Sequence, residues 1–190
     1  GAFFRTERNT FVDVVAVVEF DPKRRQRALE EYPGCKVYSD YRELFDHGEL
    51  DLVINASYSD THYSITKDLL SHGYNVLVEK PFARNYYECC DLINTAKAKG
   101  VTLAVFHQSL LAPHHLGAKA AMESGKLGDI KQISIFYNGF ARRWDWQTLQ
   151  VKMGGSVYNT GPHPIGMGLD YLGFDDHFKV AYSKLDLGLT

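Results

Sequence analysis

The chain has 190 residues, of which 45% are hydrophobic, 23% charged and 13% aromatic. This is an ordinary globular composition, and it excludes a wholly disordered or fibrous chain. The 21 basic and 23 acidic side chains leave a formal charge of -2, without the basic excess by which nucleic-acid binders neutralise phosphates. No uncharged apolar run reaches the roughly 18 residues of a membrane span, and the first residues do not resemble a signal peptide. We therefore expect neither a nucleic-acid nor a membrane partner.

The cysteines and histidines give no sign of a metal site. Cys35, Cys89 and Cys90 form neither a disulfide framework nor a spaced zinc cluster. His114 and His115 are adjacent, so on a helix they point in different directions, and they lack a carboxylate or cysteine at ligand spacing. We expect no bound metal and a reducing, cytoplasmic setting.

Short apolar runs alternate with amphipathic stretches in the first part of the chain. The runs rich in valine and other apolar residues are typical of strands buried on both faces of a parallel sheet, and they predict strands at residues 12–19, 51–56, 75–79 and 101–106. Capping residues and glycine or proline stops predict helices at residues 23–32, 41–45, 61–71 and 86–99. This order predicts an α/β fold of βαβ units with right-handed crossovers.

The pattern changes near Pro113. We therefore predict one domain over residues 1–112 and a second over residues 113–190. The second contains a helix at 114–124 and a glycine-containing helical segment at 156–172. Residues 131–137 alternate polar and apolar side chains, which favours an antiparallel strand wet on one face, and residues 177–183 are another candidate strand. Because two strands alone make a marginal sheet, the second domain is expected to be incomplete.

Glu19 ends the first predicted strand. In doubly wound nucleotide-binding folds, an acid at this place accepts hydrogen bonds from the adenosine ribose, and it would repel a 2′-phosphate, which favours NAD over NADP. Alone, a glutamate here is more often a solvated residue or a helix cap. No glycine-rich phosphate loop precedes it, so either the chain lacks its first strand and loop or the nucleotide interpretation is wrong.

Lys80 ends the third predicted strand, within Glu79-Lys80-Pro81. A lysine at the carboxyl end of a central parallel strand points into the ligand crevice of such a sheet. Pro81 turns the chain and is a candidate for a cis peptide bond. The alternative is a lysine exposed to solvent in a strand-to-helix loop.

A glycine-rich stretch at residues 154–163 places Asn159 and His163 four residues apart, so on a helix they share a face. Gly154 and Gly155 allow close backbone approach or a turn into the helix. A histidine and an amide that face a crevice suit a proton acceptor and an orienting group. The alternative is a histidine whose hydrogen bonds are satisfied within helix packing.

Together these motifs resemble the glucose–fructose oxidoreductase/inositol dehydrogenase/MocA (Gfo/Idh/MocA) family. The resemblance runs from about residue 12 to the end, and the segments that carry it are residues 51–57, 61–62, 73–81, 125–130 and 154–163. It implies a Rossmann-like doubly wound parallel sheet, followed by part of an α+β domain with an open antiparallel sheet. It also implies hydride transfer between NAD(P) and a secondary alcohol of a sugar, polyol or related molecule. Family members are longer, so we expect truncation at both ends.

The resemblance assigns roles to single residues. His163 matches the catalytic histidine that takes the hydroxyl proton, Lys80 would donate to the substrate oxygen, and Asn159 would orient the substrate. The positions that match cofactor contacts are Glu19, Phe20, Ser57, Tyr58, His62, Glu79, Lys80 and Gln108. Two positions depart from the family pattern. Asn159 stands where an aspartate is usual, which weakens any role in tuning Lys80 or His163 because an amide carries no charge. Gly166 stands where a second acid is often found.

The substrate is less well defined than the cofactor. Arg142, Arg143, Trp144 and Trp146 cluster where the second domain faces the crevice in the family. Aromatic faces suit sugar rings and an arginine suits a carboxylate, so Arg142, Trp144 and Trp146 are candidate substrate residues. An amphipathic loop packed at a subunit interface is an equal alternative.

The family commonly associates through the open face of the second sheet, which implies a homo-oligomer. Other functions stay open with the same motifs. One is transient oxidation that assists elimination or glycoside cleavage. A second is a sensor that binds dinucleotide without chemistry; Asn159 favours it, whereas Lys80 and His163 oppose it. A third is an inactive fragment, because the helix N-terminus that holds pyrophosphate is missing.

Overall fold

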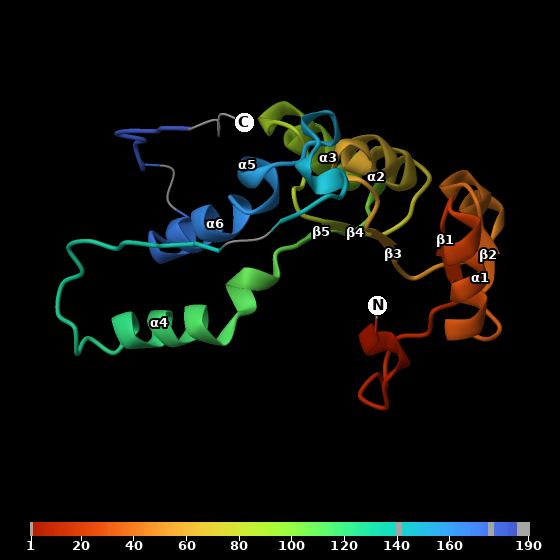
Figure 1. The fold of residues 1–190 in the computed structure, drawn as a ribbon, viewed down its shortest axis with the longest axis horizontal. Coiled ribbons are helices and arrows are strands. Elements are labelled where there is room, and N and C mark those ends of the chain that lie inside the picture. The colour runs from red at the N-terminus through yellow and green to blue at the C-terminus, as the bar shows by residue number, and fades with distance from the viewer. Residues whose placement is uncertain (1, 140–141, 175–176, 186–190) are drawn as a thin grey trace. The chain divides into compact units, whose positions relative to one another are not determined.

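The computed structural model describes residues 2–139, 142–174 and 177–185, and Figure 1 shows the order of its elements. The chain forms two compact units. Unit 1 comprises Gly1–Asn55, Tyr63–Leu77 and Tyr87–Ala104, and unit 2 comprises Ala56–His62, Val78–Tyr86 and Val105–Thr190. The units are interleaved along the chain, and the domain boundary near residue 112 stays a prediction.

The first sheet joins β1 (Ala16–Val18) to β2 (Lys36–Tyr38) in parallel, with Val17 opposite Val37. Helix α1 (Pro22–Glu31) connects the two strands, and it begins as predicted. The Asp21 side chain accepts from the Arg24 backbone N–H at 3.0 Å, and proline occupies the first helical turn. Strand β2 was missed in the sequence because three residues that begin with a lysine show no apolar periodicity.

The second sheet has the order β3 (Val53–Asn55), β4 (Val76–Glu79), β5 (Leu103–Phe106). The Val53 N–H donates to the Asn75 carbonyl, and the Val76 N–H donates to the Thr102 carbonyl. The starts of neighbouring strands therefore lie together, as they must in a parallel sheet. Helices α2 (His62–Ser71) and α3 (Tyr86–Lys99) form the connections. The four predicted strands and the α/β class are confirmed.

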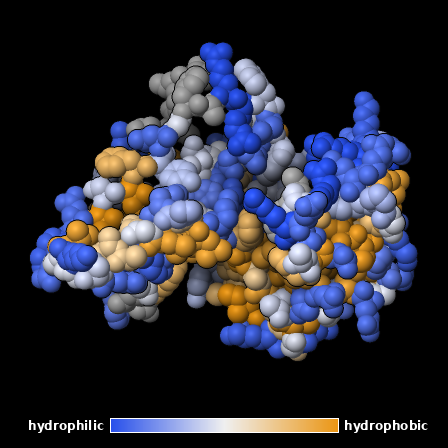
Figure 2. Space-filling model, turned by 90° about the horizontal axis from the view of Figure 1, so that it is seen from below, coloured by the Kyte–Doolittle hydropathy of each residue, from blue (hydrophilic) through white to orange (hydrophobic). Residues whose placement is uncertain are grey.

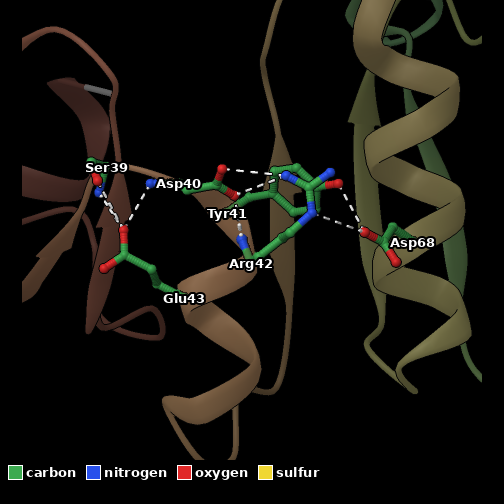
Figure 3. Close-up of polar contacts among 6 residues, drawn as sticks. All are labelled: Ser39, Asp40, Tyr41, Arg42, Glu43 and Asp68. Atoms are coloured by element: carbon green, nitrogen blue, oxygen red, sulfur yellow. Dashed lines mark hydrogen bonds and ion pairs between the residues drawn. The ribbon is translucent and has the colours of Figure 1, made fainter.

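Unit 1 has a polar link between its parts, drawn in Figure 3. The 3-10 helix η2 (Tyr41–Asp46) starts with a capping box, in which Asp40 caps the helix and Glu43 reaches back to the Asp40 N–H at 2.9 Å. The Tyr41 hydroxyl donates to Asp68 of α2 at 2.8 Å. In the same unit, Leu69 and Leu92 are almost fully buried, so α2 and α3 supply much of its core.

Unit 2 contains α4 (Pro113–Glu123), α5 (Ser156–Asn159) and α6 (Pro162–Tyr171). The predicted single helical segment at 156–172 is therefore two helices, because the sequence Gly161-Pro162 interrupts the backbone hydrogen bonds and restarts a helix. Helices α4 and α6 are joined through Asp170, which lies 2.6 Å from the buried His115 and accepts from Lys119 at 2.9 Å. The remaining 3-10 helices are η1 (Ala2–Arg5), η3 (Ser59–Thr61), η4 (Gln108–Leu111), η5 (Trp146–Thr148) and η6 (Gln150–Lys152).

Residues 131–137 and 177–183, both expected to be strands, have no strand structure. An alternating segment becomes a strand only when a neighbour hydrogen-bonds to it, and neither segment forms a strand ladder within the described residues. Ile135 instead lies close to Gly168 of α6, and an apolar groove there is lined by Ile133, Ile165 and Leu169. Figure 2 shows apolar residues, in orange, at the surface. In the segment 131–137, Phe136 is 81% exposed.

None of the helices in the described ranges combines the length and apolarity needed to cross a membrane.

Candidate functional site

Lys80 and Asn159, 79 positions apart in the sequence, meet in unit 2. Lys80 directly follows β4, and the Lys80–Pro81 peptide is cis, as the proline had indicated. The Lys80 Nζ donates to the Asn159 carbonyl oxygen at 2.9 Å and to its side-chain Oδ1 at 3.0 Å. Burial lowers the pKa of Lys80, nearby Glu79 opposes this shift, and the charge of Arg143 adds to it.

His163 lies in the first turn of α6 and is 9% exposed. Its Nδ1 is 3.1 Å from the Ser109 hydroxyl, and the Tyr137 ring stacks at 5.9 Å between centroids. Burial lowers the pKa of His163, and the charge of Lys80 lowers it further. Because Lys80 acts on His163 electrostatically, the structure brings the predicted lysine, amide and histidine into one cluster.

The two glycines before α5 are required by the local backbone. A Cβ on Gly154 would lie 2.4 Å from the Gln147 carbonyl oxygen, and Gly155 has φ of 89° while its N–H donates to the same oxygen at 2.6 Å. The close backbone approach expected there is present at Gly154, and the positive φ of Gly155 at the turn into α5 is a conformation that favours glycine. The shared helix face expected for Asn159 and His163 is wrong, since the break after Asn159 puts them on two helices. Asn159 nevertheless accepts hydrogen bonds from Lys80, and the charge of Lys80 acts on His163.

Ser57 and His62 connect the loop after β3 to the loop after β4. His62 is 1% exposed, its Nδ1 lies 2.7 Å from the Pro81 carbonyl oxygen, and its Nε2 lies 3.1 Å from the Ser57 carbonyl oxygen. The Thr61 hydroxyl donates to the Ser57 hydroxyl at 2.9 Å. The hydrogen bond of His62 to Pro81 holds the backbone next to Lys80 in place. Ser57 and His62 have this structural role in addition to any contact with a cofactor.

Tyr58 contacts two residues of the segment that follows residue 142, Trp146 and Lys152. Its ring packs edge-to-face on Trp146 at 5.1 Å, and Lys152 lies 4.9 Å over its centroid while pairing with Asp60 at 3.0 Å. Of the three predicted substrate residues, Trp146 is therefore placed beside a predicted cofactor residue. Trp144 is 92% exposed, Arg142 is also exposed, and neither is brought to the cluster.

Glu19 and Phe20 belong to unit 1, at the end of β1. The Glu19 carboxylate accepts from the Asp21 backbone N–H at 3.0 Å, lies 3.7 Å from the Arg24 guanidinium and keeps 21% of its side chain exposed. Phe20 is 64% exposed. A carboxylate at a parallel strand end with an accessible oxygen fits the hydroxyl donors of a ribose. Gln108, the first residue of η4, is exposed.

Two residues of the cluster were missed in the sequence. Ser109 contacts His163, as described above, and the His107 ring lies 5.7 Å from the His163 ring. The signal for His107 was present: like Lys80, it directly follows a parallel strand, and side chains at that end face the crevice of such sheets.

Several known proteins are similar to this chain in sequence and in fold. The model of an oxidoreductase family with an NAD-binding Rossmann fold, GFO_IDH_MocA, matches residues 1–107. The uncharacterized oxidoreductase YhhX of Escherichia coli is 32% identical over 167 residues, which are 84% of this chain and 46% of that protein. The scyllo-inositol 2-dehydrogenase (NADP(+)) IolW of Bacillus subtilis is 25% identical over 175 residues, or 91% and 49% of the two chains.

Two further comparisons agree. The 2,7-anhydro-N-acetylneuraminate hydratase of Mediterraneibacter gnavus is 28% identical over 149 residues, 77% of this chain and 39% of that protein. The solved structure of the oxidoreductase YvaA from Bacillus subtilis superposes with a TM-score of 0.73 and 25% identity, covering 83% of this chain and 43% of that one. The chain thus spans half or less of the length of these relatives. Since the family model matches more than half of the sequence, this chain belongs to the Gfo/Idh/MocA family of oxidoreductases with an NAD-binding Rossmann fold.

Proposed function

We propose that the protein transfers a hydride between NAD(P) and a secondary alcohol of a sugar, polyol or related small molecule, with the nicotinamide ring supplying the redox chemistry. The observation that carries this proposal is the cluster in unit 2, where Lys80 is held by Asn159 and acts on the nearly buried His163. The chain spans half or less of its relatives' length, so the proposal concerns the whole protein.

His163 is suited to take the hydroxyl proton of the alcohol. Its lowered pKa leaves the imidazole unprotonated at neutral pH, which is the form that a general base requires. The contact between Nδ1 and Ser109 fixes the ring. When Nδ1 donates to the Ser109 oxygen, Nε2 carries the lone pair that accepts the proton.

Lys80 is suited to bind the oxygen of the same alcohol. An ammonium group has three N–H donors, and Asn159 accepts two hydrogen bonds from Lys80. The remaining donor is available to stabilise negative charge as it develops on the substrate oxygen. In this arrangement Asn159 aims Lys80 without taking up a proton.

The cofactor residues follow from the same proposal. Glu19 would accept from the ribose hydroxyls, with Phe20 beside the adenine, and Ser57, Tyr58 and His62 would line the pyrophosphate and nicotinamide. Glu79, Lys80 and Gln108 would complete these contacts. We propose NAD as the preferred cofactor, because the Glu19 carboxylate would repel a 2′-phosphate. Calorimetric titration of the full-length protein with NAD and with NADP tests this preference, and tighter NADP binding would contradict it.

The activity test is a screen of the full-length protein. Sugars, polyols and their acids are incubated with NAD or NADP, and formation of the reduced cofactor is followed by absorbance. With an active substrate, Lys80→Ala and His163→Ala should each lower turnover by about 10²- to 10⁴-fold while circular dichroism stays unchanged. Lys126→Ala and His114→Ala, at exposed positions, are the matched controls. Near-normal turnover in either site variant would contradict the assigned roles.

A lyase is the second candidate function. Its support is the relative named as a 2,7-anhydro-N-acetylneuraminate hydratase. Such an enzyme would form product without net reduction of the cofactor, so mass spectrometry of the product alongside cofactor absorbance separates the two reactions. A dinucleotide-binding sensor is the third candidate, favoured by Asn159 in place of an acid. It would bind NAD with measurable heat and convert no substrate.

We also propose that Arg142, Trp144 and Trp146 contact the substrate and that the protein is a homo-oligomer through the surface around residues 131–137. Trp146 supports the first point, since it already packs on Tyr58. The exposed Phe136 and the half-exposed Ile133 support the second. A raised KM in Trp146→Ala and light scattering of the full-length protein test these points; an unchanged KM or a monomer would contradict them.

A further inference from the structure

His107 is a half-buried side chain that the proposed mechanism leaves unused. It follows β5, and its Nε2 is buried without a hydrogen-bond partner among the residues that the structure describes. A hydrogen bond to the Pro162 backbone acts on the ring, and proline offers only its carbonyl. Because Nε2 has no partner within the described residues, we assign the donor to Nδ1–H, which leaves the lone pair on Nε2. Burying such an acceptor costs free energy, so the surroundings must hold the ring there.

Gly166 provides the space for this ring. It lies on α6, three residues after His163, and a Cβ at this position would lie 2.2 Å from Cε1 and 3.0 Å from Nε2 of His107. The imidazole therefore occupies the place where any side chain at 166 would begin. A second acid, often found at this position in the family, and the His107 ring in its present place exclude each other.

The neighbours of His163 come from several segments, and none of those that the structure describes is an acid. Lys80 follows β4, His107 follows β5, Ser109 lies in η4, and Tyr137 stacks from the segment before residue 139. Burial is the largest cause of the lowered pKa of His163, followed by Lys80 and then His107. Two imidazoles this close resist carrying a proton each.

We propose that His107, seated in the space that Gly166 leaves open, is a positioning residue for His163, which it keeps ready to accept the substrate proton. The inference rests on the proposed function for the direction of proton transfer. It places a pair of imidazoles in the site, and it assigns Gly166 a function, which is to leave room for the His107 ring.

The decisive measurement is a pH titration of the ¹⁵N-histidine-labelled full-length protein by NMR. In the wild type, His107 should appear as the Nδ1–H tautomer. In His107→Gln the pKa of His163 should rise, by up to about half a unit, which is the Coulomb effect of one unit charge at this ring separation in water. His114→Gln, exposed on α4, should leave the pKa of His163 unchanged. An Nε2–H tautomer of His107, or an unmoved His163, would overturn the proposal.

The pairing with Gly166 is tested by a double-variant cycle. Gly166→Ala should displace the His107 ring, lower the melting temperature and raise the pKa of His163. Adding His107→Ala should recover most of the melting temperature, because the clash is gone. Purely additive losses would refute the pairing. These readouts need no turnover, so a protein that oxidises no alcohol but shows the coupled titration would refute only the proposed function. A site that turns over normally in His107→Gln with an unmoved pKa would refute only the pairing.

Discussion

Two lysines, one in each unit, show how the fold treats the same side chain differently. In unit 1, Lys67 of α2 is 40% exposed and pairs with the Asp91 carboxylate of α3, which also accepts from Tyr63 at 2.8 Å. The hydrogen bond to Asp91 raises the pKa of Lys67. In unit 2, Lys80 is partly buried and its acceptors are the carbonyl and amide oxygens of Asn159, so burial lowers its pKa.

Under the proposed function, Lys67 is a structural charge and Lys80 is a charge that acts on the substrate. A carboxylate partner at the surface stabilises the ammonium form of Lys67 and compensates its charge, so little of that charge acts on other groups. Neutral acceptors orient an ammonium without neutralising it, and its charge then acts on neighbours such as His163. Burial is the largest cause of the lowered pKa of both Lys80 and His163, whereas the raised pKa of Lys67 comes chiefly from its hydrogen bond to Asp91. Groups perturbed by burial together with a nearby charge are candidates for a functional site.

The largest expected difference between the two lysines is the change in turnover when an oxygen acceptor of each is removed. Asn159→Leu takes away one of the two acceptors of Lys80, so the ammonium is no longer aimed, and turnover should fall by about 10²-fold. Asp91→Leu does the same to Lys67 and should leave turnover unchanged. Steady-state kinetics of the full-length protein checks both. Equal losses in the two variants would mean that the contrast between the clusters has no catalytic meaning.

A carboxylate placed beside Lys80 should raise its pKa, as Asp91 raises the pKa of Lys67. In Asn159→Asp a carboxylate faces Lys80, which raises the pKa of Lys80 by about one unit or more. Any high-pH loss of activity that reports deprotonation of Lys80 should then move to higher pH by a similar amount. A pH–rate profile of kcat/KM for both proteins checks the shift. A profile that stays in place would show that Lys80 is not the group that titrates there.

A third effect is on acid stability. The pKa of His163 and that of His107 lie below their ordinary value of 6.5, so between these values the unfolded chain binds more protons than the folded one. The free energy of unfolding should therefore fall as the pH drops below about 6.5, until the pH passes the folded-state pKa. Urea unfolding at about pH 7.5 and about pH 5.5 measures the loss. His163→Gln should reduce it and His114→Gln should not; the reverse pattern would contradict the assignment.

The strands and helices could be read from the sequence where apolar periodicity and caps agree. The Asp21–Pro22 start of α1 and the four apolar strands are examples. Strand β2 could not be read, since it depends on pairing with β1 rather than on its own pattern. Residues 131–137 show the converse, because their alternation is real but they form no strand ladder within the described residues.

Within the candidate site, the sequence indicated the residues that lie near strand ends and in the glycine-rich stretch. Of the predicted residues, Lys80 and Asn159 are joined by hydrogen bonds, and the charge of Lys80 acts on His163; their catalytic roles stay a prediction. The position of His107 after a strand could have been read from the sequence, but its packing against Gly166 could not, because it depends on the space that the missing side chain of Gly166 leaves for the ring. The sequence shows that position 166 is a glycine, but only the structure shows which side chain fills the space beside it.

The smallest expected effect is at the structural lysine. Lys67→Met removes an ion pair whose partners are both about 40% exposed, and water and salt already weaken such a pair. The melting temperature should therefore drop slightly in low-salt buffer, and the difference from wild type should vanish in about 1 M salt, where charges are screened within about 3 Å. Differential scanning fluorimetry at both salt concentrations makes the test. A large loss that persists in high salt would mean that the pair of Lys67 and Asp91 behaves as a buried interaction, and the contrast with Lys80 would then have to rest on the neutral acceptor alone.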